Sequence, residues 1–73
     1  MSYKLVMKTK PFGYVRKNDV ENRHLQKQKA GILFNHMPEV ESVWVGNDMG
    51  ETALYLRKDP ITGQCIMREE NDV

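Results

Sequence analysis

Two closely spaced turn signals constrain the last third of this chain more than any other feature. Residues 47–50 (Asn-Asp-Met-Gly) separate a run around Val43-Trp44-Val45 from a second run over 52–57, and residues 59–63 (Asp-Pro-Ile-Thr-Gly) separate that run from 64–68. Proline presets the first position of a turn, and glycine supplies the positive φ at its exit. Three short runs joined in this way predict an antiparallel β-meander.

The first half of the chain predicts a strand and a helix ahead of this meander. Ser2 to Lys8 alternates between apolar and basic positions, which is typical of a half-buried strand. Helix-favouring residues then run from Val20 to about His36, with Asn18 or Asp19 as the cap and Pro38 as the stop. The expected apolar face of this helix consists of Leu25, Ala30, Leu33, Phe34 and Met37.

Two local questions stay open at this point. Residues 14–16 fit either a second short strand or an extended loop, because Pro11 and Gly13 interrupt the pattern before them. Gly31 lies inside the expected helix, where glycine costs about 1 kcal/mol relative to alanine. The helix therefore either continues through Gly31 or breaks there.

The prediction for the whole chain is one small α+β domain over residues 1–73. It has an N-terminal strand, one helix and a three-stranded antiparallel meander packed on the helix, with a flexible acidic tail at about 69–73. Cys65 is the single cysteine of the 73 residues, so a hydrophobic core rather than an internal disulfide must hold the fold. The short apolar runs predict a soluble cytoplasmic protein with no membrane segment.

The charge is divided between the two parts of the chain. Residues 1–31 carry eight basic and two acidic side chains, a sum of +6, whereas residues 32–73 carry three basic and eight acidic ones, a sum of −5. A net charge of +1 therefore conceals a dipolar sequence. Such a division predicts a docking module, whose basic part could meet phosphate or an acidic protein surface.

Side chains that would support catalysis or metal binding are sparse. Ser2 and Ser42 lie outside any nucleophile-turn motif, and His24 and His36 are twelve residues apart, which is not a metal-ligand spacing. Cys65 in a strand is typical of a small hydrophobe. The sequence therefore predicts a protein that is not an enzyme and that holds no metal and no cofactor.

The segment from Lys8 to Lys17 combines cations with aromatic side chains, a pattern that favours ribose-phosphate contact and base stacking. Its stretch Lys-Pro-Phe-Gly-Tyr-Val (10–15) resembles the RNA-binding signature of RNA-recognition motifs and cold-shock domains. The resemblance implies stacking by Phe12 and Tyr14 and a phosphate contact by Lys10. The stretch departs from the signature at Pro11, and Lys17 stands where the recognition motif has an aromatic residue.

Two further regions supply candidate contacts. Arg23 and Lys27 project together from the expected helix, with Lys29 beside them. Trp44 points away from its valine neighbours, so it is either core or an exposed anchor, depending on which sheet face the helix covers. The complete set of predicted partner-binding residues is Lys8, Lys10, Phe12, Tyr14, Arg16, Lys17, Arg23, Lys27 and Trp44.

In its length, its single mixed α/β domain, its segregated charge and its acidic end, the chain resembles small phage-encoded regulators of bacterial RNA polymerase, of the type found in a Xanthomonas phage. The resemblance implies a non-enzymatic protein that binds host polymerase at the β′ N-terminal region and the β flap, and we expect the chain to be a monomer. The resemblance further implies inhibition of initiation through disturbed σ factor engagement, promotion of antitermination and contact with nascent RNA. Two alternatives are a single-stranded RNA or DNA binder and an inhibitor of another host protein, such as a nuclease.

Overall fold

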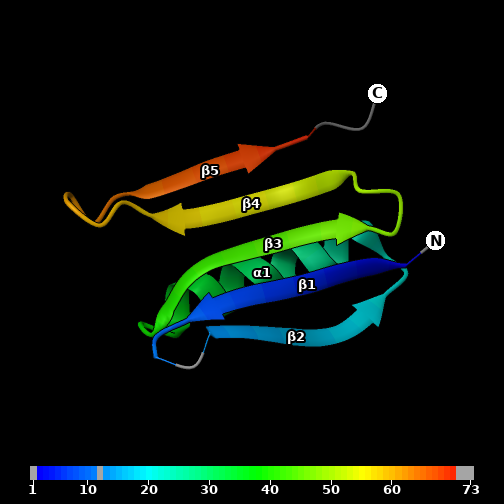
Figure 1. Cartoon of the computed structure of the whole chain (residues 1–73). Coiled ribbons are helices and arrows are strands. Elements are labelled where there is room, and N and C mark those ends of the chain that lie inside the picture. The colour runs from blue at the N-terminus through cyan, green and yellow to red at the C-terminus, as the bar shows by residue number, and fades with distance from the viewer. Residues whose placement is uncertain (1, 12, 71–73) are drawn as a thin grey trace.

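The computed structural model describes residues 2–11 and 13–70 of the chain, and these form one sheet and one helix. The elements are β1 (Tyr3–Thr9), β2 (Gly13–Val20), α1 (Arg23–His36), β3 (Val40–Asn47), β4 (Thr52–Lys58) and β5 (Cys65–Glu69). All neighbouring strands are antiparallel, in the order β2-β1-β3-β4-β5. The helix lies across one face of this sheet, behind β1 and β3 (Figure 1).

The predicted α+β class with one helix and antiparallel strands is confirmed, and the strand count is corrected from four to five. Residues 14–16 belong to β2, which pairs with β1 from Thr9↔Gly13 to Tyr3↔Val20. Gly13 has a φ of 85°, a backbone conformation that glycine adopts without strain, and this allows the tight return after β1. As a result β1, the first strand in sequence, has a paired neighbour on both sides.

The helix begins three residues later than predicted. Asn22, and neither Asn18 nor Asp19, is the N-cap: its side-chain oxygen accepts the Leu25 backbone N–H at 3.2 Å. The earlier positions are unavailable because β2 continues through Val20. Gly31 does not break the helix, which runs on to His36.

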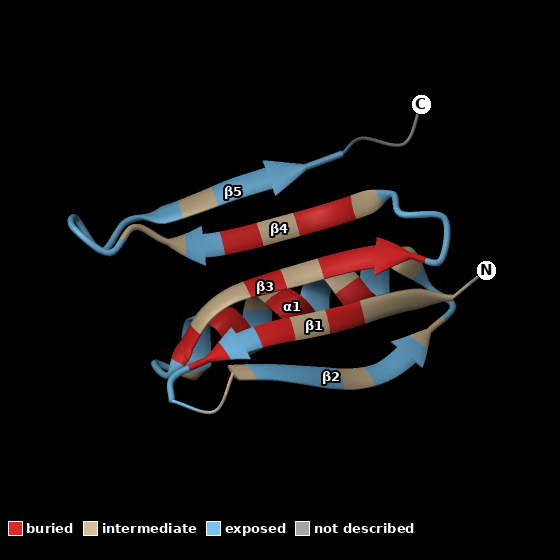
Figure 2. Ribbon diagram, viewed as in Figure 1, coloured by how far each residue is buried: buried red, intermediate tan, exposed pale blue. Residues whose placement is uncertain are grey.

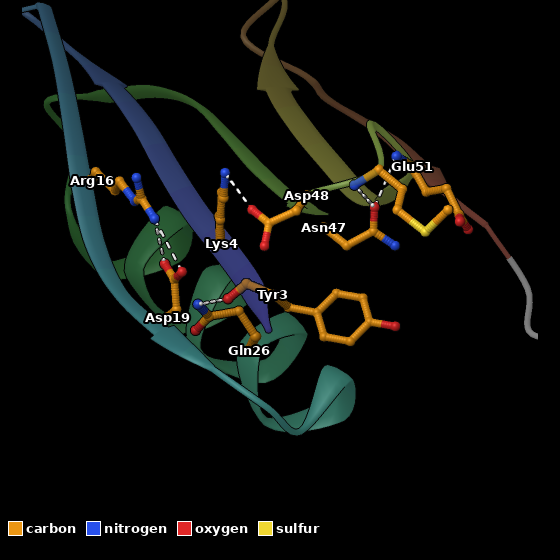
Figure 3. Close-up of polar contacts among 9 residues, drawn as sticks. Tyr3, Lys4, Arg16, Asp19, Gln26, Asn47, Asp48 and Glu51 are labelled. Atoms are coloured by element: carbon orange, nitrogen blue, oxygen red, sulfur yellow. Dashed lines mark hydrogen bonds and ion pairs between the residues drawn. The ribbon is translucent and has the colours of Figure 1, made fainter. Parts of the chain in front are cut away.

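The buried face of α1 differs from the predicted one. Gln26, Ala30 and Phe34 are buried at four-residue spacing, whereas Leu25 is 56% exposed, so its assignment to the apolar face was wrong. The side chain of Gln26 is fully enclosed and donates from Nε2 to the carbonyls of Tyr3 at 2.8 Å and Asn18 at 3.3 Å. This buried amide therefore ties the helix to β1 and β2; Figure 3 shows its contact with Tyr3.

The core lies between α1 and the three central strands, which are largely buried on that side, while β2 and β5 are mostly exposed (Figure 2). Its buried apolar members are Leu5, Met7, Ala30, Phe34, Val40, Val43, Val45, Ala53, Leu54 and Leu56. No helix in the described ranges has the length and apolar character needed to cross a bilayer.

The end of the sheet includes part of the segment predicted as a tail. Glu69 is the last residue of β5, and the Glu70 N–H donates to the Ala53 carbonyl at 3.2 Å. Residues 71–73 of the predicted tail lie outside the described residues.

Candidate nucleic-acid interface

The sheet has one covered face and one open face. Leu5, Met7, Val43 and Val45 point toward α1 and are buried, so the residues that alternate with them point to the opposite side. No described element packs on that opposite side (Figure 1). Its side chains therefore form a surface available to a ligand, which we call the open face.

Two rows of directly paired residues cross the open face from β2 to β5. The first row consists of Arg16, Val6, Trp44, Tyr55 and Arg68. The second row consists of Tyr14, Lys8, Ser42, Arg57 and Ile66. These ten residues include three aromatic and four cationic side chains and no acidic one. The open face thus combines rings and positive charge at the spacing of neighbouring strands, about 4.8 Å.

Trp44 lies near the centre of the first row. Because α1 covers the side of Val43 and Val45, Trp44 belongs to the open face and not to the core between the sheet and the helix. Its indole Nε1–H donates to the Thr52 hydroxyl at 2.9 Å, and the side chain is partly buried. The polar edge of the ring is therefore satisfied within the protein while part of its apolar surface stays accessible.

Ion pairs border the open face near β1 and β2. Figure 3 shows Arg16 directed at Asp19, 3.0 Å from each carboxylate oxygen, and Lys4 directed at Asp48, 2.6 Å away. The hydrogen bond and charge of Lys4 lower the pKa of the Asp48 carboxyl. Exposed pairs of this kind contribute only about 0–1 kcal/mol each. A phosphate group could therefore replace the carboxylate at little cost.

At the other end of β1, Lys8 and Lys10 share one acid. Their Nζ atoms lie 3.9 and 3.2 Å from the carboxylate of Glu41, which sits at a register shift between β1 and β3. Because one carboxylate serves two ammonium groups, this corner of the open face retains positive charge. It is the corner where Tyr14, 74% exposed, stands opposite Lys8.

The β4–β5 end of the open face carries Arg57 and Arg68, and Glu70 lines an adjoining cavity beside Tyr55 and Arg68. Tyr55, Arg57, Ile66 and Arg68 line a shallow cavity of about 360 Å³. Within residues 2–11 and 13–70, neither Arg57 nor Arg68 forms an ion pair. Each guanidinium group could therefore contact an incoming anion without first breaking a salt bridge within the described residues.

The predicted contact residues are distributed over several surfaces. Lys8, Tyr14, Arg16 and Trp44 lie together on the open face, and Lys10 lies in the adjoining β1–β2 turn. Phe12 lies outside the described residues.

The other three predicted cations lie elsewhere. Lys17 is paired with Leu5 and shares the helix side of the sheet. Arg23 donates to the Glu70 carbonyl, and Lys27 forms an ion pair with Glu69, so both helix cations hold the end of β5. They do not extend the open face.

Sequence reasoning missed the contribution of β4 and β5, namely Tyr55, Arg57, Ile66 and Arg68. The alternation of Leu54 and Leu56 with Tyr55 and Arg57 was a usable signal, because it places the last two on a single face. What the sequence lacked was the strand pairing that brings them beside Trp44.

The fold also changes the meaning of the divided charge. Lys4, Lys8, Lys10 and Lys27 of the basic part all pair with acids of the acidic part. Because β1 lies directly beside β3, the two parts interleave rather than form separate poles.

Comparison with known proteins gives no match: no protein-family model, no curated sequence and no solved structure resembles this chain significantly. Over the described residues, no group of three or more His, Cys, Asp or Glu side chains is placed to hold a metal ion.

Proposed function

We propose that this chain is a non-enzymatic protein that binds single-stranded RNA or DNA on its open face. The observation that carries the proposal is the pair of cross-strand rows, which place three aromatic and four cationic side chains side by side with no acid among them. Single-stranded nucleic acids present unstacked bases beside a charged backbone, and proteins bind them with this combination of rings and cations.

The aromatic rings and the cations occupy different positions on the open face. Trp44 and Tyr55 are neighbours at its centre, and Tyr14 stands at the β2 edge, so rings are available at more than one position along a strand of bases. Arg16 and Arg68 stand at opposite ends of the first row, where the phosphates of a strand crossing the sheet would pass. A duplex hides its base faces, so it would use the cations alone.

The test is a titration of labelled oligonucleotides followed by fluorescence anisotropy. We expect single strands of about 4–16 nucleotides to bind more tightly than a duplex of equal length, with affinity that falls as salt rises. Lys8→Ala should weaken binding. Lys29→Ala is the control, because it also removes one exposed lysine but from the helix, and it should leave binding unchanged. Absence of binding, or equal loss in both variants, would contradict the proposal.

As a second proposal, the chain acts as a phage-type regulator of host bacterial RNA polymerase in the cytoplasm. It would bind the β′ N-terminal region and the β flap, inhibit initiation by disturbing σ factor engagement and promote antitermination. A transcript leaving polymerase is a single strand. The aromatic and cationic side chains of the open face suit a ligand of this kind, and this favours the second proposal.

Affinity capture from bacterial lysate separates the two proposals. Near-stoichiometric polymerase that stays bound after nuclease treatment would support the regulator. Nucleic acid that nuclease removes, with no protein retained, would support direct binding alone. Retention of a different protein would point to the inhibitor alternative.

A further inference from the structure

The sheet ends at β5 in a row of backbone groups that no described strand pairs. The carbonyl of Gln64 accepts the Asp59 N–H at 2.8 Å, and the Glu70 N–H donates to Ala53, so the even-numbered residues direct their backbone groups toward β4. Backbone direction alternates along an antiparallel strand. The N–H and C=O groups of Cys65, Met67 and Glu69 therefore point away from the sheet.

The two edges of the sheet differ in how they are protected. β2 carries several charged side chains and a register shift against β1 near Tyr3, features by which natural sheets blunt an edge. β5 pairs with β4 in regular register from Leu54↔Glu69 to Lys58↔Cys65, without a bulge or a proline. β5 is therefore the edge able to accept another strand.

We propose that β5 pairs antiparallel with β5 of a second copy of this chain, about a two-fold axis at Met67. In this register Met67 stands opposite Met67 of the second copy, and Cys65 stands opposite Glu69. All three outward-pointing residues of each strand then exchange backbone hydrogen bonds across the axis. The proposal differs from the monomer predicted from sequence because the free edge exists only in the folded sheet.

Charge excludes one neighbouring register, and the length of β5 disfavours the other. Shifting the pairing by two residues in one direction places Arg68 opposite Arg68 of the second copy, and like charges directly opposite are destabilising. Shifting it in the other direction places Glu69 opposite Gly63, which lies in the β4–β5 turn beyond the strand. The register centred on Met67 has no like charges opposite one another.

The apolar side chains on the helix side also favour a second copy. The backbone of α1 does not reach β5, which lies on the far side of β4 from it (Figure 1), and a groove of about 470 Å³ remains there. Phe34, Leu54, Leu56 and Met67 contribute its apolar lining, and Met67 is 62% exposed. Across the axis the two Met67 side chains would meet on this side and shield each other from water.

Sedimentation velocity over micromolar to millimolar protein tests the assembly. We expect the wild type to dimerise, and Met67→Lys to raise the dimer dissociation constant by about tenfold or more, because two ammonium groups then face each other. The matched control is Met49→Lys, which adds the same charge at another exposed methionine, and should leave the dimer intact. A wild type that stays monomeric, or a dimer that survives Met67→Lys, would overturn the proposal.

Disulfide formation tests the register and does not depend on the lysine variant being folded. In a Cys65→Ser background, Met67→Cys should give a covalent dimer on oxidation, because Cα atoms paired across an axis lie about 5.5 Å apart, within disulfide range. Met49→Cys in the same background should not. In the wild type the two Cys65 residues would lie four residues apart along the paired strands, about 13 Å, and should not link. Linking at Cys65 but not at position 67 would refute this register.

Discussion

The indole of Trp44 occupies the space that any side chain at Gly46 would need. A Cβ atom built at position 46 would lie 2.0 Å from Cζ2 of Trp44 and 2.6 Å from the carbonyl oxygen of Glu51. The indole therefore lies across the backbone of its own strand, held at its edge by the hydrogen bond to Thr52. Glycine at this position allows a large ring to lie on the open face rather than stand away from it.

Gly46→Ala should consequently displace the Trp44 ring and weaken nucleic-acid binding. We expect a loss comparable to that of Trp44→Ala, on the order of 1–3 kcal/mol if one base stacks there. Tryptophan fluorescence should shift as the ring leaves its site, and oligonucleotide titration gives the affinity. Binding unchanged in both variants would show that this ring does not contact the ligand.

Gly31→Ala is the matched substitution of a second glycine, and we expect it to stabilise the fold rather than disturb it. Gly31 lies within α1, and a Cβ atom there would meet no other atom within 4 Å. We expect an increase of about 0.5–1 kcal/mol in the free energy of unfolding, because alanine loses less conformational entropy in a helix. Urea denaturation measures it. A decrease would contradict the helix packing described here.

Arg57→Gln and Arg68→Gln should each reduce the salt dependence of binding to a single strand. Each guanidinium that neutralises a phosphate contributes about 0.7 to the slope of log K against log salt. The measurement is the affinity of one oligonucleotide across a series of salt concentrations. Lys29→Gln, on the exposed side of α1, serves as the control and should leave the slope unchanged.

Acid should loosen the attachment of β5 to the helix. The hydrogen bond and charge of Lys27 lower the pKa of the Glu69 carboxyl in the folded state. The resulting stabilisation is therefore present above the unfolded pKa of about 4.3 and is lost as pH falls through the lower folded value. Urea unfolding between neutral pH and about pH 3 should show a smaller acid-dependent loss for Glu69→Gln than for the wild type. Identical pH profiles would exclude this contribution.

Gln26→Leu should destabilise the fold although it makes the core more apolar. The substitution removes the Nε2 donor and leaves the carbonyls of Tyr3 and Asn18 without that partner. We expect a loss of about 1–3 kcal/mol from leaving these partly buried carbonyls without their donor, even though leucine also removes the Oε1 of Gln26, which is buried without a hydrogen-bond partner. Denaturant unfolding measures it, and a more stable variant would show that burial of the leucine outweighs the lost hydrogen bonds.

The sequence was informative where local chemistry decides the structure. Turn residues at 47–50 and 59–63 predicted the meander, and alternation in residues 2–8 predicted β1. The start of α1 was misplaced because the pairing of β2 with β1 extends the strand to Val20 and overrides the cap signal at Asn18. The burial of Gln26 could not be predicted, because only the folded chain supplies the two carbonyls to which its Nε2 donates.

The site was predictable only in part for the same reason. Tyr14 and Arg16 belong to a segment whose composition already suggested binding. Tyr55 and Arg68 lie in separate strands, and their relation to Trp44 follows from a register of long sequence separation. The composition of one segment can predict binding residues that are adjacent in sequence. It cannot predict a surface built across five strands, because that surface depends on how the strands pair.

The position of β1 in the middle of the sheet has a consequence for the order of folding. During synthesis β1 and β2 are made before α1 and β3 and can pair as a hairpin, but Leu5 and Met7 lack their packing partners until those two elements follow. Tyr3 pairs with Asn47, so the contact between β1 and β3 closes a long loop. Closing such a loop is slow compared with hairpin formation. We therefore expect the apolar side of β1 to be exposed in the nascent chain, and exposed apolar surface at that stage favours aggregation.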